Sequence, residues 1–159
     1  MKLNKYEELI NRQQSEYNKF PIKFAFSDEQ FKQSMNELGL KENDTDKIIG
    51  IGAGGFIKKE DKEAYSEMIN RFNKEFEESI SANSTGRGFI KDMFSYELAN
   101  HEYCYTHDLT DTLDSLGLDI EKINNSNSLR KGLKLAINQY EKEIDELEME
   151  WRIWQLMNF

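Results

Sequence analysis

The chain has 159 residues, of which 38% are hydrophobic and 32% are charged, a balance that suits one domain with its own core and disfavours two well-packed ones. Ten Phe, seven Tyr and two Trp argue against a disordered chain. The formal net charge of −9 disfavours direct binding to nucleic acid or to anionic membranes and favours a basic partner.

The sequence predicts neither export nor membrane insertion. Its single cysteine cannot form an internal disulfide, and no apolar run approaches the roughly 20 residues of a membrane span. The charged residues that follow Met1 are not a secretory signal. We therefore expect a cytoplasmic protein without membrane contact.

The first third of the chain predicts a helix, a strand and a second helix. Apolar residues at helical spacing indicate an amphipathic helix over residues 3–18. Apolar residues then alternate from Phe20 to Ser27, which predicts a strand. Ser27 starts the second helix, with Gln30 completing a capping box, and Gly39 suits the left-handed residue that ends it.

A glycine-rich stretch follows between Lys47 and Lys58. Gly50, Gly52 and Gly55 match the dinucleotide fingerprint G-x-G-x-x-G, which requires a helix to begin at its third glycine. Here the residues after Gly55 have extended character, and the chain has no room for the surrounding βαβ unit. We therefore predict a β-hairpin or bulged strand and expect no cofactor.

Apolar residues return to helical spacing in the middle of the chain. They predict a long helix after Asp61, another over residues 89–98, and a short helix over residues 110–116 that ends at Gly117. The Leu-Gly-Leu sequence at Gly117 repeats the one at Gly39 and predicts a shared C-cap.

A heptad pattern covers the last part of the chain and predicts a helix over residues 128–158, about 45 Å long. A helix of that length exceeds a compact domain of this size, so its distal half is expected to project or to pair. We predict an α+β, predominantly helical fold: a small antiparallel sheet packed by four or five helices in residues 1–127, and the long C-terminal helix in 128–159. The apolar seam of that helix consists of Leu133, Ile137, Tyr140, Ile144, Leu147, Trp151 and Trp154.

Both histidines and the only cysteine lie within residues 97–108. On a continuous helix, side chains six residues apart diverge by about 120°, so His101 and His107 could share an ion only across a turn. Alternatively, Glu97 and His101 bond each other or the nearby backbone at a helix end, as one turn allows. The possible zinc ligands are Glu97, His101, Cys104, His107 and Asp108.

Cys104 also raises the alternative of nucleophilic catalysis with one of the histidines. Its neighbours Tyr103 and Tyr105 instead favour a buried, inert thiol. We accordingly predict no catalytic residue and no metal site in this segment.

The predicted C-terminal helix is unusually acidic. Residues 141 to 150 contain six acidic residues and one basic residue, Lys142. Most solvated helices instead interleave positive and negative side chains. This surface is either an ordinary solvated exterior or one that binds a basic groove, with Trp151 and Trp154 as anchors or as a self-association surface. The acids are Glu141, Glu143, Asp145, Glu146, Glu148 and Glu150.

Three stretches carry a resemblance: Phe24 to Ser27 entering a helix, the glycines from Gly50 to Phe56, and Glu97 to Tyr103 with the letters ELANHEY. Over residues 5–125 the chain resembles small uncharacterised proteins of Firmicutes and their phages. In size and acidity it is also similar to phage-encoded inhibitors of bacterial defence, such as anti-CRISPR and antirestriction proteins.

These resemblances imply a phage or mobile-element accessory protein in the host cytoplasm. It would bind a protein, such as a nucleic-acid-handling defence enzyme, and would transform no substrate. Two alternatives remain: a small metal-dependent or hydrolytic enzyme at His101, Cys104 and His107, and a homo-oligomeric structural protein that dimerises through the C-terminal helix.

Overall fold

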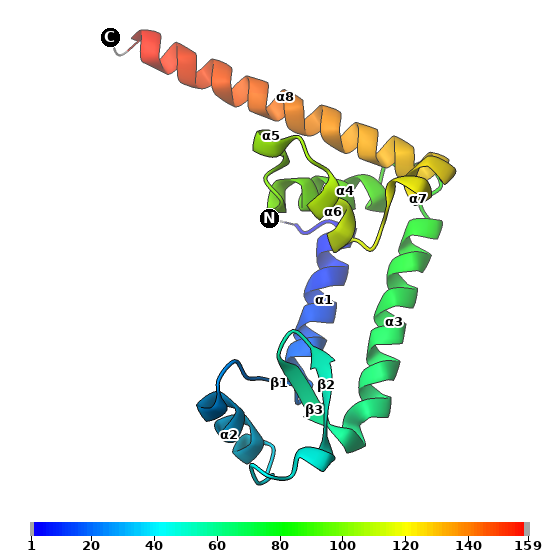
Figure 1. Ribbon diagram of the computed structural model, residues 1–159. Helices are drawn as coiled ribbons and strands as arrows, with labels where there is room; N and C mark the ends of the chain where they lie inside the picture. Colours follow the sequence, from blue (N-terminus) through cyan, green and yellow to red (C-terminus); the bar gives the residue numbers. More distant parts are fainter. Residues whose placement is uncertain (1, 158–159) are drawn as a thin grey trace. The chain divides into compact units, whose positions relative to one another are not determined.

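The computed structural model, which describes residues 2–157, is predominantly helical with a three-stranded antiparallel sheet (Figure 1). It confirms the predicted fold class, and the last two residues of the chain, including the predicted helix end at Asn158, lie outside the described residues. The strands are β1 (Lys23–Phe24), β2 (Ile48–Gly52) and β3 (Gly55–Lys58). The helices are α1 (Lys5–Lys19), α2 (Asp28–Glu37), α3 (Lys62–Ser81), α4 (Phe89–Asn100), α5 (Tyr103–Thr106), α6 (Thr110–Ser115), α7 (Ile120–Asn125) and α8 (Asn127–Met157), with 3-10 turns at Thr45–Lys47 and Lys59–Asp61.

The chain forms two compact units. Residues 9–76 make up the first, here called the sheet unit, and residues 1–8 and 77–159 make up the second, here called the α8 unit. Within the α8 unit, α8 packs on α4, α5 and α7.

In the sheet unit, the glycine-rich stretch forms the predicted hairpin. β3 lies between β1 and β2, and both neighbours run antiparallel to it. Ala53 and Gly54 turn the chain with positive φ angles of 49° and 76°, the conformation that two-residue hairpins favour. The register shifts between Gly50 and Gly52, so β2 also has the predicted bulge. A hairpin cannot place a helix N-terminus against a pyrophosphate, which agrees with rejecting the dinucleotide fingerprint.

β1 is much shorter than the predicted strand from Phe20 to Ser27. The Phe26 N–H donates to the side chain of Gln30 (2.8 Å) and not to a neighbouring strand, while Ser27 Oγ accepts from the Gln30 N–H (3.2 Å). The start of α2 thus takes the backbone group that would extend the strand. Phe24 and Phe26, which the predicted strand would place on one face, are both exposed.

The core of the sheet unit lies between α2 and one face of the sheet. Phe56 of β3 packs with Met35 of α2 and with Leu38, the C-cap of that helix, and its ring lies 5.3 Å from that of Phe31. Ile57, which alternates to the other face of β3, is also fully buried. β3 is therefore covered on both faces.

Both Leu-Gly-Leu sequences end their helices in the same way, as predicted. Gly39 has a φ of 72°, and the N–H of Leu40 reaches back to the carbonyl of Met35 (2.9 Å). At Gly117, with a φ of 62°, the N–H of Leu118 reaches back to Leu113 (3.0 Å). Both are Schellman caps, which place a leucine after each glycine against its helix.

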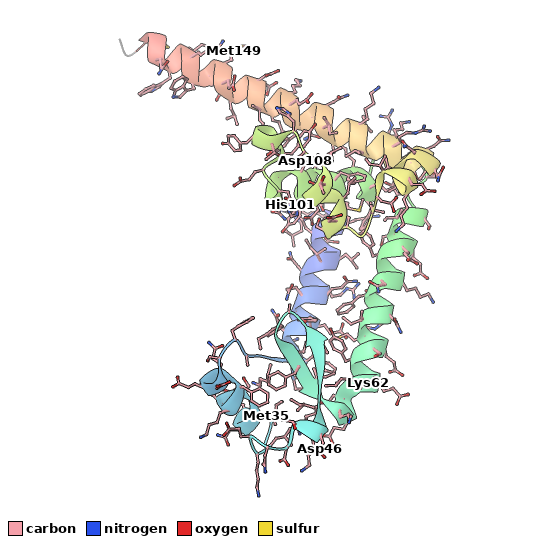
Figure 2. The ribbon with its side chains drawn as sticks, in the orientation of Figure 1. Met35, Asp46, Lys62, His101, Asp108 and Met149 are labelled. Carbon is pink, nitrogen blue, oxygen red and sulfur yellow. The ribbon has the colours of Figure 1, made fainter. Side chains whose placement is uncertain are left out.

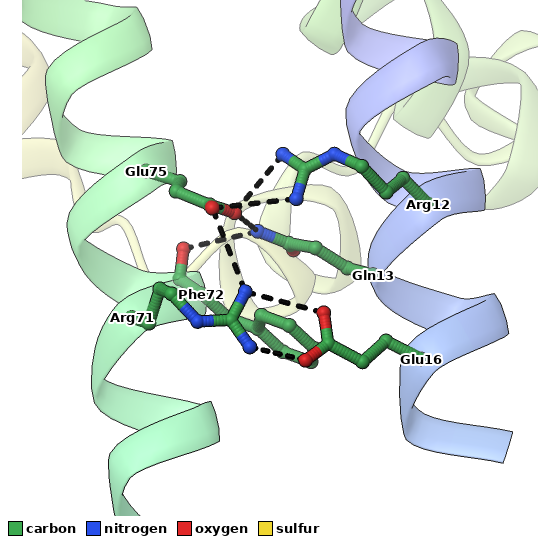
Figure 3. A network of polar contacts seen from close by, with 6 residues as sticks. All are labelled: Arg12, Gln13, Glu16, Arg71, Phe72 and Glu75. Carbon is green, nitrogen blue, oxygen red and sulfur yellow. Dashed lines mark hydrogen bonds and ion pairs between the residues drawn. The ribbon is translucent and has the colours of Figure 1, made fainter. Parts of the chain in front are cut away.

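A polar network joins α1 to α3 within the sheet unit (Figure 3). Arg12 binds both carboxylate oxygens of Glu75, at 3.3 and 3.1 Å, and Gln13 donates to the same carboxylate at 3.0 Å. Arg71 binds Glu16 through both terminal nitrogens. A solvent-exposed pair usually contributes less than about 1 kcal/mol, but bidentate geometry and shared partners make a network more effective.

In the α8 unit, the core lies between α4 and the first half of α8. Ile90, Met93, Phe94 and Leu98 of α4 are fully buried. Gly132 allows α8 to approach closely, because a Cβ there would lie 2.4 Å from Ile90 Cγ2. The α8 side chains that complete this core are Leu129, Leu133 and Ala136.

Candidate functional site

The segment that holds both histidines contains a buried carboxylate, Glu97 of α4, in the α8 unit. Tyr6 Oη donates to Glu97 Oε1 at 2.6 Å, and Ser115 Oγ lies 3.3 Å from Oε2. His101, the C-cap of α4 (Figure 2), places Nε2 3.4 Å from Oε2 of the same carboxylate. This agrees with the predicted structural pairing of Glu97 with His101 at a helix end.

Tyr6 is held tightly by this carboxylate. Its ring makes edge-on contacts with Phe89 and Tyr96, at centroid distances of 5.7 and 5.6 Å. Burial, followed by the hydrogen bond to Glu97, raises the pKa of Tyr6 far above its ordinary value. The phenol therefore remains a neutral donor and links the N-terminal segment to α4.

The other candidate ligands do not join this cluster. His107 has a positive φ of 51° and contacts the ring of Tyr103 edge-on at 5.5 Å. Asp108 (Figure 2) accepts hydrogen bonds from the N–H and Oγ1 of Thr110, at 2.9 and 2.7 Å, and these bonds lower the pKa of its carboxyl. Across residues 2–157, no three His, Cys, Asp or Glu side chains are grouped as metal ligands would be.

Cys104 faces a shallow groove between α5 and α8. The groove has a volume of about 390 Å³, and the half-buried thiol forms one part of its wall. Burial and a hydrogen bond with Cys104 raise the pKa of Tyr140 on the facing helix. The groove is lined by Tyr103, Cys104, His107, Tyr140, Glu141, Ile144, Asp145 and Glu148.

Beyond this groove, the distal half of α8 is exposed within its own unit. Leu133 of the seam is only 8% exposed, whereas Leu147 is 64%, Trp151 59% and Trp154 61% exposed. Figure 2 shows Met149, also exposed, on the same distal part of the helix. The seam is therefore buried at one end and open to solvent at the other.

The six predicted acids, Glu141 to Glu150, all lie on this distal half and are all exposed. Lys142 forms an ion pair with Glu146 at 3.7 Å. The acids and the seam tryptophans thus lie on one stretch of helix.

Sequence reasoning missed the partners of Glu97 and the α1–α3 network. Tyr6 reads as one more apolar member of its helix, and nothing in its surroundings indicates a hydrogen bond to a residue 91 positions away. Ser115, in α6, gave no signal either. Arg12 and Arg71 look like ordinary charges on the solvated faces of amphipathic helices.

The chain belongs to the protein family described as "Family of unknown function (DUF7659)", whose model matches residues 5–139. No curated protein matches the chain, and no solved structure matches it either. The match includes the Glu97 cluster and the first half of α8. The acids from Glu141 onward and both tryptophans lie outside it.

Within the described residues, no helix has the length and apolarity needed to cross a bilayer.

Proposed function

We propose that this family member acts by binding another protein, through the acidic and tryptophan-bearing distal half of α8. The observation that carries the proposal is the exposure of the apolar seam there, with Leu147, Trp151 and Trp154 each more than half exposed. Contiguous exposed apolar surface with a polar rim marks an interaction site, and tryptophans are frequent anchors of such sites.

The charges around this surface indicate the kind of partner. Six acids lie within ten residues, so the local field attracts a positively charged surface and repels phosphate backbones and anionic lipids. A protein with a basic surface therefore fits better than nucleic acid or a membrane.

Binding is also favoured over the hydrolytic alternative by the contacts of the candidate chemical groups. Glu97 accepts hydrogen bonds from Tyr6 and Ser115, while Asp108 accepts hydrogen bonds from Thr110. These contacts position helices and turns, and neither carboxylate is among the residues that line the groove beside Cys104.

The more specific proposal concerns the partner's identity. A basic groove that ordinarily holds a phosphate backbone would complement this acidic helix. We therefore propose a nucleic-acid-handling defence enzyme of a bacterial host as the partner, with the chain acting in the cytoplasm as a phage or mobile-element inhibitor. Its support is the charge of the chain and its resemblance to such inhibitors.

The test is capture of partners from a bacterial lysate by the full chain and by a variant with Glu143, Glu146 and Glu150 changed to Lys. We expect the variant to lose the partner, and wild-type binding to weaken as salt is raised. A matched control reverses three exposed acids outside α8, namely Glu67, Glu77 and Asp114.

If the variant with Lys at Glu143, Glu146 and Glu150 captured the partner as well as wild type does, binding through this surface would be contradicted. A partner that is lost as expected but does not handle nucleic acid would retain the binding function and remove the defence-enzyme proposal. Circular dichroism of both variants checks that α8 still folds.

A further inference from the structure

The seam of α8 continues without interruption from its buried half into its exposed half. In heptad terms, Ile137, Ile144 and Trp151 occupy one set of seam positions, and Leu133, Tyr140, Leu147 and Trp154 occupy the other. The first half of this face packs on α4. The exposed half therefore presents a surface of the kind that another helix covers.

The residues that flank the seam share one charge. Glu143 and Glu150 lie beside it on one side, and Glu141 and Glu148 lie beside it on the other. All four side chains are exposed. In paired helices, these flanking positions meet across the interface and decide which partners are allowed.

A second copy of this chain is a poor occupant of the exposed seam. In a parallel pair, Glu143 would lie opposite Glu148 of the second copy. In an antiparallel pair, each flanking Glu would again face a Glu. Like charges oppose both arrangements, so the flanking residues act against self-pairing through this seam.

Resting on the proposed function, we infer that the distal half of α8 binds an amphipathic helix of another protein. That helix carries aliphatic residues on its seam and Lys or Arg at the positions that flank it. Each flanking Glu then meets a base, while Leu147, Trp151 and Trp154 pack against the aliphatic seam. The contact spans about 15 Å along α8 from Ile144 to Trp154, which is two to three helical turns.

The first test supplies the complementary helix by charge exchange. A variant of the full chain carries Lys at Glu141, Glu143, Glu148 and Glu150, and sedimentation is measured for each protein alone and for their equimolar mixture. We expect both proteins to be monomeric alone and to form a dimer when mixed. A wild type that dimerises by itself, or a mixture that stays monomeric, overturns the inference.

The second test uses synthetic peptides and needs no folded variant. A basic amphipathic peptide with a Leu and Ile seam and Lys flanks should bind the wild-type chain at least about tenfold more tightly than a scrambled peptide of the same composition. Equal binding of both peptides overturns the helix inference and leaves acidic-surface binding in place. No binding of either peptide overturns both proposals.

A matched pair of substitutions then locates the binding face. Leu147 and Met149 are exposed by 64% and 61%, but Met149 lies about 160° around the helix from the seam position of Leu147. Leu147→Ser should weaken binding of the basic peptide about tenfold, whereas Met149→Ser should change it less than about twofold. Equal losses from the two variants would place the peptide on another face and overturn the inference.

Discussion

The proximal half of α8, residues 127–140, and its distal half, residues 141–157, carry the same heptad seam in different surroundings. In the proximal half, Leu133 and Ala136 are buried against α4, and Gly132 permits the close approach. In the distal half, Leu147 and Trp151 are more than half exposed. The comparison shows that an apolar seam specifies which face of a helix is suited to packing. The rest of the fold determines along which part of the helix that face is buried.

The two halves also differ in charge and in whether the family model covers them. The proximal half contains Arg130, Lys131 and Lys134, whereas the distal half is dominated by acids. The family match ends at residue 139, close to the point where burial of the seam declines. Packing of α8 on α4 thus belongs to the matched region, and partner binding is proposed for this chain in particular.

The largest expected effect comes from one substitution made in each half. Leu133→Ala removes a buried side chain and should lower the free energy of unfolding of the α8 unit by about 2–5 kcal/mol. Leu147→Ala, at the equivalent seam position two heptads later, should change it by less than about 0.5 kcal/mol. Hydrogen exchange of the α4 amides measures the change in unfolding free energy for both variants. Equal losses would show that the distal seam is packed in solution.

A smaller loss of stability is expected at the hydrogen bond that joins the N-terminal segment to α4, the helix on which the proximal half packs. Tyr6→Phe removes the 2.6 Å hydrogen bond to Glu97 and leaves a buried carboxylate with one donor fewer. The α8 unit should lose about 1.5–3 kcal/mol of stability, as for other hydrogen bonds to charged groups. Hydrogen exchange again measures the loss, with the exposed Tyr105→Phe as the control.

The same phenol predicts a pH dependence. Because burial and Glu97 raise the pKa of Tyr6 in the folded state, its contribution is complete below the unfolded value of about 10 and is lost as the pH rises above it. Urea denaturation between about pH 9 and 11 should therefore show a steeper decline for wild type than for Tyr6→Phe. If the stability of wild type and of Tyr6→Phe declined in parallel with pH, the raised pKa of Tyr6 would be contradicted.

The smallest expected effect lies in the distal half. Asp145 is one helical turn from Glu141 and from Glu148, so Asp145→Gln relieves two like-charge contacts, each costing about 0.2–0.5 kcal/mol. Amide exchange in distal α8 should slow slightly, and added salt should reduce the difference. Lys142→Gln is the opposing control, because it removes the ion pair with Glu146 and should speed exchange. If both variants changed the exchange rate in the same direction, charge would not determine the stability of the distal half.

The elements most accurately predicted from sequence are those specified by local chemistry. The hairpin at Gly54, the caps at Gly39 and Gly117, and the length of α8 each follow from residues within a few positions of one another. The strand at Phe20 to Ser27 was predicted too long. Its alternation was correctly identified, but the cap of α2 competes for the backbone group of Phe26.

The candidate site divides in the same way. Pairing of Glu97 with His101 was predictable because one helical turn separates them. Tyr6 and Ser115 reach the same carboxylate only through folding of the chain, and no spacing in the sequence indicates that. The division into two units was also unforeseen, because helical periodicity does not reveal which helices pack together.

By itself, the sequence determined α1 to α4, α6 and α8, the hairpin, the heptad seam and the excess of acid beside it, because each is set by short-range backbone geometry and side-chain type; it predicted neither α5 nor α7. Only the tertiary structure decided that Glu97 accepts a hydrogen bond from Tyr6, and that the seam is covered as far as the half-buried Ile144 and exposed from Leu147 onward. Those outcomes depend on contacts between residues far apart in the chain, where burial is decided by which surfaces meet.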